Sequence, residues 1–128
     1  MSADPLQEWV QKAEEDWEAV RRLLDSGTAE AVADVVVFLC QQSAEKYLKA
    51  ILVEVDQEPP HTHNLGVLLD LVTETIPQLE VIRDDTEALS PFAVAFRYPG
   101  EWAAEAEVHQ ALAMARRIRD ALREYLKL

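Results

Sequence analysis

The stretch VVVFLCQQSAEKYLKAILVEV, from Val35 to Val55, decides the fold. Its opening VVVFLC has the composition of a buried strand, but the apolar pattern continues to Val55 without a Gly or a Pro. A strand is short, whereas a helix can be this long. The stretch therefore predicts a helix, and apolar residues all round it indicate that this helix lies at the centre of the fold. We expect it to begin near Thr28, as a possible N-cap, and to end at about Val55.

Apolar residues at helical spacing predict four further segments, which cover Pro5–Asp25, Asn64–Thr75, Glu80–Phe96 and Glu101–Leu126. Asp4 is suited to cap the first segment, and Thr62 or Asn64 the segment after the central helix. Pro91 either kinks one helix or begins a new one that is capped by Ser90. Residues 1–128 are thus predicted to form one all-α domain, an antiparallel up-and-down four-helix bundle with an additional short helix.

The composition and charge of the chain exclude some classes of function. The chain has 128 residues, is 49% hydrophobic and carries a formal net charge of −12. Such an acidic protein repels a phosphate backbone at long range, so we expect no DNA binding, although a local basic spot remains able to hold RNA or a nucleotide. Cys40 is the only cysteine and has apolar neighbours, which favours a buried small hydrophobe over a nucleophile.

Location follows from what the sequence does not contain. No apolar run reaches the roughly 18 residues that a membrane-spanning helix needs. The N-terminal MSADPLQEWV has no basic region followed by an apolar stretch, so it does not resemble a signal peptide. We expect a cytoplasmic protein without a membrane segment.

Polar residues interrupt the second half of the central helix. Glu45 and Lys49 are four residues apart, with the glutamate first, which is the favourable order for a pair on a helix surface. Gln41 lies one turn earlier on the same stripe, and Gln42 and Lys46 form the neighbouring stripe. Two interpretations stay open. The stripes are either a solvated edge of the helix or a strip that positions another residue or contacts a phosphate or a base.

The sequence RYPG, from Arg97 to Gly100, breaks the chain before the last helix. In the functional interpretation the polar strip faces this loop, where Arg97 clamps a phosphate and Tyr98 stacks on a base or donates its hydroxyl. In the alternative interpretation Arg97 is a structural residue paired with Glu45 or Glu101, and Tyr98 is buried.

Four motifs occur in a fixed order: WVQKAEEDWEAVRRLL, CQQSAEKYLKAIL, HTHNLGVLL and FRYPGE. Together they resemble the HEPN family over Leu6 to Leu126, and most of all the small prokaryotic HEPN proteins encoded beside a minimal nucleotidyltransferase. The resemblance implies a helical bundle that commonly dimerises and has a role with nucleotides or RNA. Some relatives are RNase toxins whose paired nucleotidyltransferase is the antitoxin. Others have been proposed as the substrate-binding half of a nucleotidyltransferase.

The RNase members of this family carry an Arg followed, after four to six residues, by a His. Arg97 lies in the corresponding region, but Trp102, Ala103 and Ala104 occupy the positions where the His is required. The next histidine is His109, twelve positions beyond Arg97. The motif is therefore absent. Arg97 and His109 remain the candidates for catalysis, and no catalytic residue is assigned.

His61 and His63 form a His-x-His pair in the loop before the third segment. With Asp56 or Glu58 as a third ligand, such a pair suits a metal ion, but two ligands alone rarely define a site. We favour a loop and helix-cap role, with His63 packed over the start of the third segment, and we expect neither a metal nor a cofactor.

We expect a HEPN-domain protein that binds a nucleotide or RNA, a partner minimal nucleotidyltransferase, or both, as part of a toxin–antitoxin-like pair. The candidate ligand-binding side chains are Gln42, Glu45, Lys46, Lys49, Arg97 and Tyr98. One alternative is a metal-independent RNase that uses Arg97 with a non-standard histidine, His109 or His63. Another is a purely structural dimerisation module. A homodimer is expected, and whether the chain is an enzyme stays open.

Overall fold

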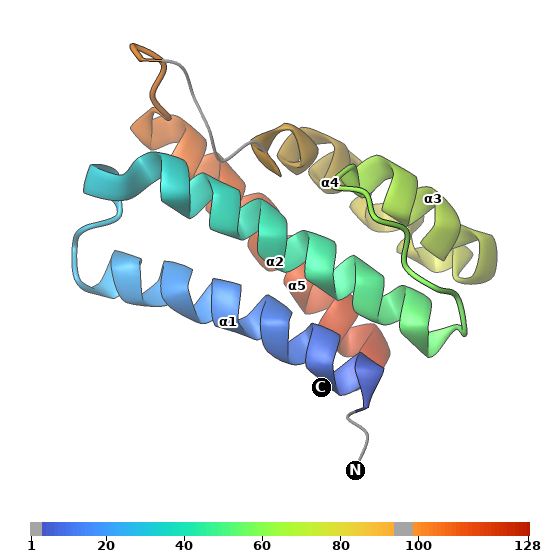
Figure 1. Cartoon of the computed structure of the whole chain (residues 1–128). Coiled ribbons are helices and arrows are strands. Elements are labelled where there is room, and N and C mark those ends of the chain that lie inside the picture. Colours follow the sequence, from blue (N-terminus) through green and yellow to red (C-terminus); the bar gives the residue numbers. More distant parts are fainter. Residues whose placement is uncertain (1–3, 94–98) are drawn as a thin grey trace.

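The computed structural model describes residues 4–93 and 99–128. These residues form the α-helices α1 (Pro5–Asp25), α2 (Ala33–Glu54), α3 (Leu65–Thr75), α4 (Arg83–Leu89) and α5 (Glu105–Leu126) (Figure 1). Three short 3₁₀ helices accompany them: η1 (Glu30–Val32), η2 (Pro77–Ile82) and η3 (Ser90–Ala93). The described part of the chain contains no strand, and the predicted all-α class is confirmed.

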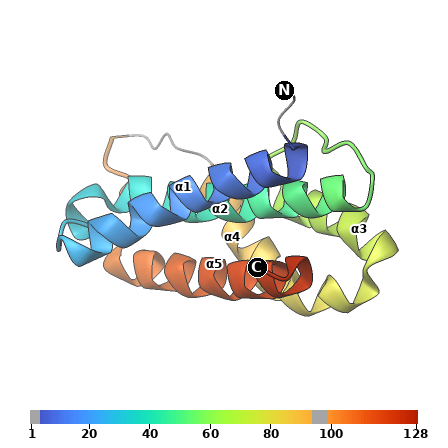
Figure 2. The same ribbon diagram turned by 90° about the horizontal axis from the view of Figure 1, so that it is seen from below.

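The helices are arranged around α2, which contacts α1, α3, α5 and η3. Figures 1 and 2 show that α1 and the η2–α4 segment run in one direction, whereas α2 and α5 run in the other. These four form the up-and-down bundle. The helix α3 is the additional short helix, and it lies beside α2 and runs the same way.

The core explains why α2 is central. Its last turns bury large apolar side chains against α3 and α5, and all of the following are fully buried: Tyr47, Leu48, Ile51, Leu52, Leu65, Leu68, Leu69, Ile118 and Leu122. Close packing of this kind is the main source of stability in a helical domain. Among the described residues, no helix is both long enough and apolar enough to cross a membrane.

Two of the predicted helix caps are present. The Asp4 Oδ1 atom accepts a hydrogen bond of 3.0 Å from the backbone N–H of Leu6 at the start of α1. The Asn64 Oδ1 atom accepts one of 3.1 Å from the N–H of Val67 at the start of α3. Each bond satisfies a donor that the first turn of a helix leaves without a partner. Asn64, not Thr62, is thus the cap of α3.

Two predicted helix boundaries are wrong. The central helix begins at Ala33 after the 3₁₀ turn η1, with no side-chain cap, and Thr28 instead lies 2.7 Å from Ser26 across their hydroxyls. The last helix begins at Glu105 and not at Glu101, because Asp34 Oδ1 accepts a 2.7 Å hydrogen bond from the N–H of Ala103 and holds this backbone outside the helix. A tertiary contact of this kind has no local sequence signal.

The segment predicted at Glu80–Phe96 is also divided differently. It begins earlier, in η2 at Pro77, continues as α4 and ends in η3, which contains Pro91. Neither a kinked helix nor a new α-helix begins at Pro91 within the described residues, which end here at Ala93. Over one or two turns, the apolar spacing of a 3₁₀ helix and of an α-helix are hardly different, so the pattern did not separate them.

Charged groups tie α1, α2 and α5 together at their partly buried junction. The Glu14 carboxylate of α1 accepts two hydrogen bonds from Arg119 of α5, at 2.8 and 2.7 Å, and a third of 3.2 Å from Arg123. Arg123 also donates to the hydroxyl of the buried Tyr47, at 3.0 Å. Burial, together with the neighbouring Glu14, raises the pKa of Tyr47 to about 12. Burial also raises the pKa of Glu14, but hydrogen bonds from Arg119 and Tyr47 outweigh it, so this pKa lies below its usual value.

We expect Glu14→Gln to lower the free energy of unfolding at pH 7 by about 1–3 kcal/mol, since it removes hydrogen bonds between charged groups. Because the folded-state pKa of Glu14 is depressed, its stabilisation is present above the unfolded-state pKa, near 4.5, and is lost as the pH falls through the folded-state pKa. Denaturant unfolding at several pH values should therefore show the two curves converging below pH 4.5. The exposed Glu15→Gln is the matched control and should behave like the wild type.

Cys40 is fully buried in α2, and burial raises the pKa of its thiol to about 12. The expectation of an inert, buried cysteine is confirmed for its placement. Because the thiolate is the reactive form, we expect a thiol reagent such as dithionitrobenzoate to modify the native protein at least about 100-fold more slowly than the unfolded protein. Rapid modification of the folded protein would contradict this burial.

Candidate functional site

The polar stripe of α2 that contains Gln41, Glu45 and Lys49 is not a solvated edge of the helix. The side chains of Glu45 and Lys49 are 4% and 9% exposed, and Gln41 is fully buried. The surface-pair interpretation is therefore wrong for these three residues. They form a polar cluster inside an otherwise apolar helix interface. We call this cluster, which also includes Gln42 and His63, the Glu45 cluster.

Glu45 is the hub of this cluster. Its Oε1 atom lies 2.9 Å from Nδ1 of His63 and accepts hydrogen bonds from the amides of Gln42 and Gln41, at 3.3 and 3.4 Å. Its Oε2 atom is 3.2 Å from the ammonium of Lys49. The Lys49 ammonium also lies 5.6 Å from the centroid of the Trp9 ring on α1, within the range of a cation–π contact. The buried carboxylate thus has a complete set of partners, as a buried charge requires.

The loop between α2 and α3 brings His63 to this carboxylate. After α2 ends, residues 55–64 turn back along the helix before α3 begins (Figure 1). The Gln41 amide donates a 2.9 Å hydrogen bond to the backbone carbonyl of His63, which fixes the loop to α2. Asn64 then begins α3 as its cap. The sequence predicted a loop role for His63 but placed it over α3, whereas the imidazole contacts α2.

The second polar stripe of α2 faces α1. Lys46, whose side chain is 24% exposed, forms an ion pair of 2.7 Å with Asp16 of α1. Gln42 is partly buried and links this stripe to the first one, because its amide donates to Gln41 Oε1, at 2.7 Å, as well as to Glu45 Oε1. Of the predicted ligand-binding residues that the structure describes, Gln42 and Lys46 are partly exposed, whereas Glu45 and Lys49 are buried.

The other predicted site residues are not gathered here. Arg97 and Tyr98 lie outside the described residues. His109 is on the second turn of α5 and is 69% exposed, and its Nε2 atom lies 3.5 Å from Glu105, which is itself 66% exposed. This is an ordinary surface contact between residues one helical turn apart.

The positions of the described side chains show whether they could hold a metal ion. Within residues 4–93 and 99–128, no group of three or more His, Cys, Asp or Glu side chains is placed to hold a metal ion. His63 is directed to Glu45 as a hydrogen-bond partner, and the loop that carries it is held by amides.

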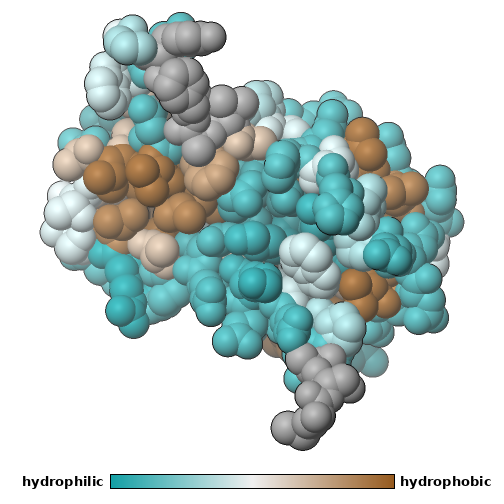
Figure 3. Space-filling view, in the orientation of Figure 1, coloured by the Kyte–Doolittle hydropathy of each residue, from teal (hydrophilic) through white to brown (hydrophobic). Residues whose placement is uncertain are grey.

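The surface is divided into two kinds of face. Figure 3 shows an apolar patch over the start of α2 and a mainly hydrophilic surface over the middle of the molecule. At the apolar end, Val32, Val35 and Trp102 are 36%, 49% and 76% exposed and help to line a cavity of about 460 Å³. Trp102 is thus not a core residue.

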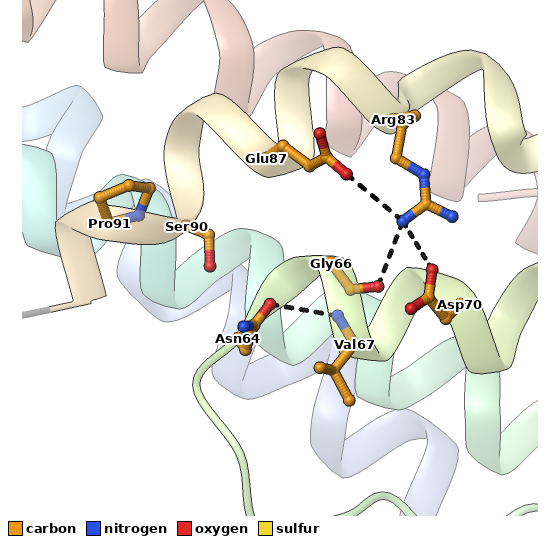
Figure 4. Close-up of a pocket in the computed structure, with 8 residues that line it drawn as sticks. All are labelled: Asn64, Gly66, Val67, Asp70, Arg83, Glu87, Ser90 and Pro91. Carbon is orange, nitrogen blue, oxygen red and sulfur yellow. Dashed lines mark hydrogen bonds and ion pairs between the residues drawn. The ribbon is translucent and has the colours of Figure 1, made fainter.

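A cavity of about 590 Å³ lies between α3 and α4 (Figure 4). Arg83 projects into it, but its guanidinium is 2.7 Å from Asp70 and 3.8 Å from Glu87, and it also forms two hydrogen bonds with Glu80. Three carboxylates more than neutralise this one cation. The cavity is therefore poorly suited to a phosphate, and the Glu45 cluster is the better candidate site.

Comparisons with known proteins identify the family of the chain and a protein of similar fold. The sequence model of the HEPN domain matches residues 6–125. The fold is similar to the crystal structure of TT1696 from Thermus thermophilus, with a TM-score of 0.76 and 22% sequence identity over 95% of this chain and 98% of that chain. No curated protein matches the sequence. The chain belongs to the HEPN domain family.

Proposed function

We propose that this HEPN domain binds single-stranded RNA or a nucleotide at the surface formed by Gln42, Lys46 and His63, and that it acts with a separately encoded minimal nucleotidyltransferase in a toxin–antitoxin-like pair. Membership of a family linked to RNA and nucleotides supports this function. The absence of the family's Arg–His spacing after Arg97 favours binding as the basic activity.

One observation carries the proposal. A buried, fully partnered carboxylate, Glu45, lies in the central helix, where an apolar pair would serve folding as well as the buried pair of Glu45 and Lys49. Glu45 holds the amide of Gln42 and the imidazole of His63 near the surface. The cation Lys46 lies one helical turn after Gln42 on α2.

The Gln42 amide nitrogen already donates to Gln41 and Glu45, so its free oxygen can accept from a base edge. The Lys46 ammonium has three hydrogens and shares one with Asp16, so it can also donate to a phosphate.

Titration calorimetry with a short single-stranded RNA and with ATP and GTP tests the proposal. We expect Lys46→Ala to weaken binding by about fivefold, or about 1 kcal/mol. The slope of log K against log salt should fall by about 0.7, since one phosphate contact is lost. Lys12→Ala, an exposed lysine of α1, is the control and should leave both values unchanged.

The partner is tested by co-expression. A minimal nucleotidyltransferase encoded next to this chain should co-purify with it. The proposal fails if calorimetry detects no heat with that enzyme, with RNA or with any nucleotide.

A specific observation favours a homodimer as a second candidate role. Val32, Val35 and Trp102 expose apolar surface at one end of the molecule (Figure 3), on an otherwise charged protein. Contiguous exposed apolar surface is typical of interfaces. Light scattering should give a dimer mass that returns to the monomer mass in Val35→Lys, and a monomeric wild type at micromolar concentration would refute this role.

A further inference from the structure

The two glutamine amides beside Glu45 have a fixed orientation, because one of them donates to the backbone. The carbonyl oxygen of His63 only accepts hydrogen bonds, so the end of the Gln41 amide that lies 2.9 Å from it is the nitrogen. The other end of this amide, Oε1, also only accepts, and it lies 2.7 Å from the Gln42 amide. The end of Gln42 that faces Gln41 is therefore its nitrogen. Glu45 Oε1 takes the second hydrogen of each amide, at 3.4 and 3.3 Å.

The remaining atom of the second amide, Gln42 Oε1, is an acceptor that solvent reaches. Within residues 4–93 and 99–128, no group donates a hydrogen bond to it. In the same ranges, no buried side-chain nitrogen or oxygen atom lacks a hydrogen-bond partner. Gln42 Oε1 is consequently not a buried atom, in agreement with the partial exposure of this residue.

His63 presents a second acceptor. The Lys49 ammonium and the two amide nitrogens only donate, so Glu45 serves as a carboxylate, which only accepts. The hydrogen of a neutral His63 imidazole is therefore on Nδ1, 2.9 Å from Glu45 Oε1, and the lone pair is on Nε2. The ring is 72% exposed, so its Nε2 edge faces solution. Both acceptors belong to groups that are bound to one atom, Glu45 Oε1, so they are neighbours at the surface.

A pair of neighbouring acceptors selects a ligand with two neighbouring donors. The Watson–Crick edge of guanine carries N1–H beside the N2 amino group. Adenine and cytosine carry one amino group beside a ring nitrogen that only accepts, and uracil carries one N–H between two carbonyl oxygens. Each of these three bases would leave one of the two protein acceptors without a donor, which costs affinity. Unstacked bases of single strands are recognised along this edge.

We propose that this site recognises guanine, with Gln42 Oε1 and His63 Nε2 accepting from its N1–H and N2 amino groups. The inference rests on the proposed function, namely that a nucleotide or an RNA strand binds at this surface. Lys46, one helical turn after Gln42 on α2, donates to a phosphate of the same ligand. Gln41 and Glu45 do not touch the base. They are positioning residues, which fix the atoms that Gln42 and His63 present to it.

Titration calorimetry at pH 8, above the range in which an imidazole ordinarily titrates, compares GMP with AMP, CMP and UMP. GMP should bind about fivefold or more tightly than each of the others, the discrimination expected when a bidentate pair of hydrogen bonds is lost. IMP is the matched ligand, since it differs from GMP only in lacking the N2 amino group, and it should also bind more weakly than GMP.

An oligouridylate in which one uridine is replaced by guanosine distinguishes the two sources of guanine. If this strand binds more tightly than the unsubstituted oligouridylate, the ligand is an RNA strand. If the preference is seen with GMP alone, the ligand is a free nucleotide. Either result supports recognition of guanine by this site.

Variants of the two acceptors should reduce the preference without unfolding the chain. In Gln42→Ala and in His63→Ala, the ratio of the GMP and AMP affinities should fall by about threefold or more, since one acceptor is lost. Lys46→Ala should instead weaken all four nucleotides equally, because a phosphate contact carries no base identity. The matched controls are His61→Ala, exposed in the same loop as His63, and Gln110→Ala, exposed on α5, and both should keep the wild-type ratio.

Glu45→Gln tests positioning by a readout that a merely structural role would not move. The oxygen of the new amide is drawn to the Lys49 ammonium, and its nitrogen then faces His63. The hydrogen of the imidazole should move to Nε2, which converts this acceptor into a donor. We expect ¹⁵N NMR of the imidazole to report the change of tautomer, and the ratio of the GMP and AMP affinities to fall by about threefold or more. An unchanged tautomer with an unchanged ratio would remove Glu45 from the recognition of the base.

The remaining outcomes separate the inference from the proposed function. Equal affinities for the four nucleotides, or a preference for another base, overturn the inference and leave the proposed function intact. No heat with any nucleotide or with RNA overturns both. A preference for GMP that is undiminished in Gln42→Ala and in His63→Ala, with both variants folded by circular dichroism, means that guanine is recognised elsewhere and also overturns the inference.

Discussion

Glu45→Ala is expected to lower the free energy of unfolding by about 3 kcal/mol or more, because it leaves the Lys49 ammonium buried without its counter-charge. On a helix surface, the same i to i+4 pair would contribute only about 0.3–0.5 kcal/mol. Urea unfolding followed by circular dichroism measures the difference directly, and the midpoint should move with little change in slope.

Two control variants test whether the buried charge of Lys49 causes this loss of stability. Glu18→Ala removes a carboxylate that pairs with Arg21 and Arg22 at similar helical spacing, but on an exposed face, and it should leave the unfolding midpoint almost unchanged. The double variant Glu45→Leu/Lys49→Met replaces both buried charges with apolar groups and should recover most of the stability. If Glu45→Ala is as mild as Glu18→Ala, the carboxylate is not buried as described.

This contrast shows where sequence reasoning reached its limit. The spacing of Glu45 and Lys49 is identical for a surface pair and for a buried one, since i to i+4 neighbours share a face wherever that face points. What buries the pair is the return of residues 55–64 along α2 and the contact with Trp9. Both are tertiary contacts, and neither leaves a trace within the helix itself.

Local signals, in contrast, were sufficient for most of the fold. The apolar run from Val35 to Val55 predicted a long central helix. Asp4 was predicted as a cap, and Asn64 as one of two alternatives with Thr62, because a cap acts within three residues. The start of α5 was predicted four residues too early, because the bond from Ala103 to Asp34 joins residues far apart in sequence.

The role of His63 in the candidate site had one usable signal. It directly precedes Asn64, the cap of α3. A residue just before a helix cap has a fixed backbone, so its side chain has a defined direction. The sequence did not indicate that the direction is toward Glu45, because the two residues lie on opposite sides of a loop whose path depends on the docking of α3.

Weakening the packing of α3 on the bundle is therefore expected to cause a second large loss in the free energy of unfolding. We expect Leu69→Ala to lower the free energy of unfolding by about 2–5 kcal/mol, since Leu69 is fully buried and its truncation leaves a cavity in the apolar contact of α3 with its neighbours. Val67→Ala, on the exposed side of the same helix, is the matched control; the Val67 side chain is 44% exposed and should contribute little. Thermal or urea unfolding compares the two.

The same variant connects the core to the candidate site. Because α3 is held against the rest of the bundle by Leu69 and its neighbours, and because Asn64 begins that helix, weaker docking should loosen the loop that carries His63. Hydrogen exchange in Leu69→Ala should then increase at the amides of α3 and of the loop before it, but not in α1, which does not pack on α3 to any comparable extent. Uniformly faster exchange over the whole chain would instead mean that α3 unfolds only with the bundle, and that the position of His63 is as stable as the core.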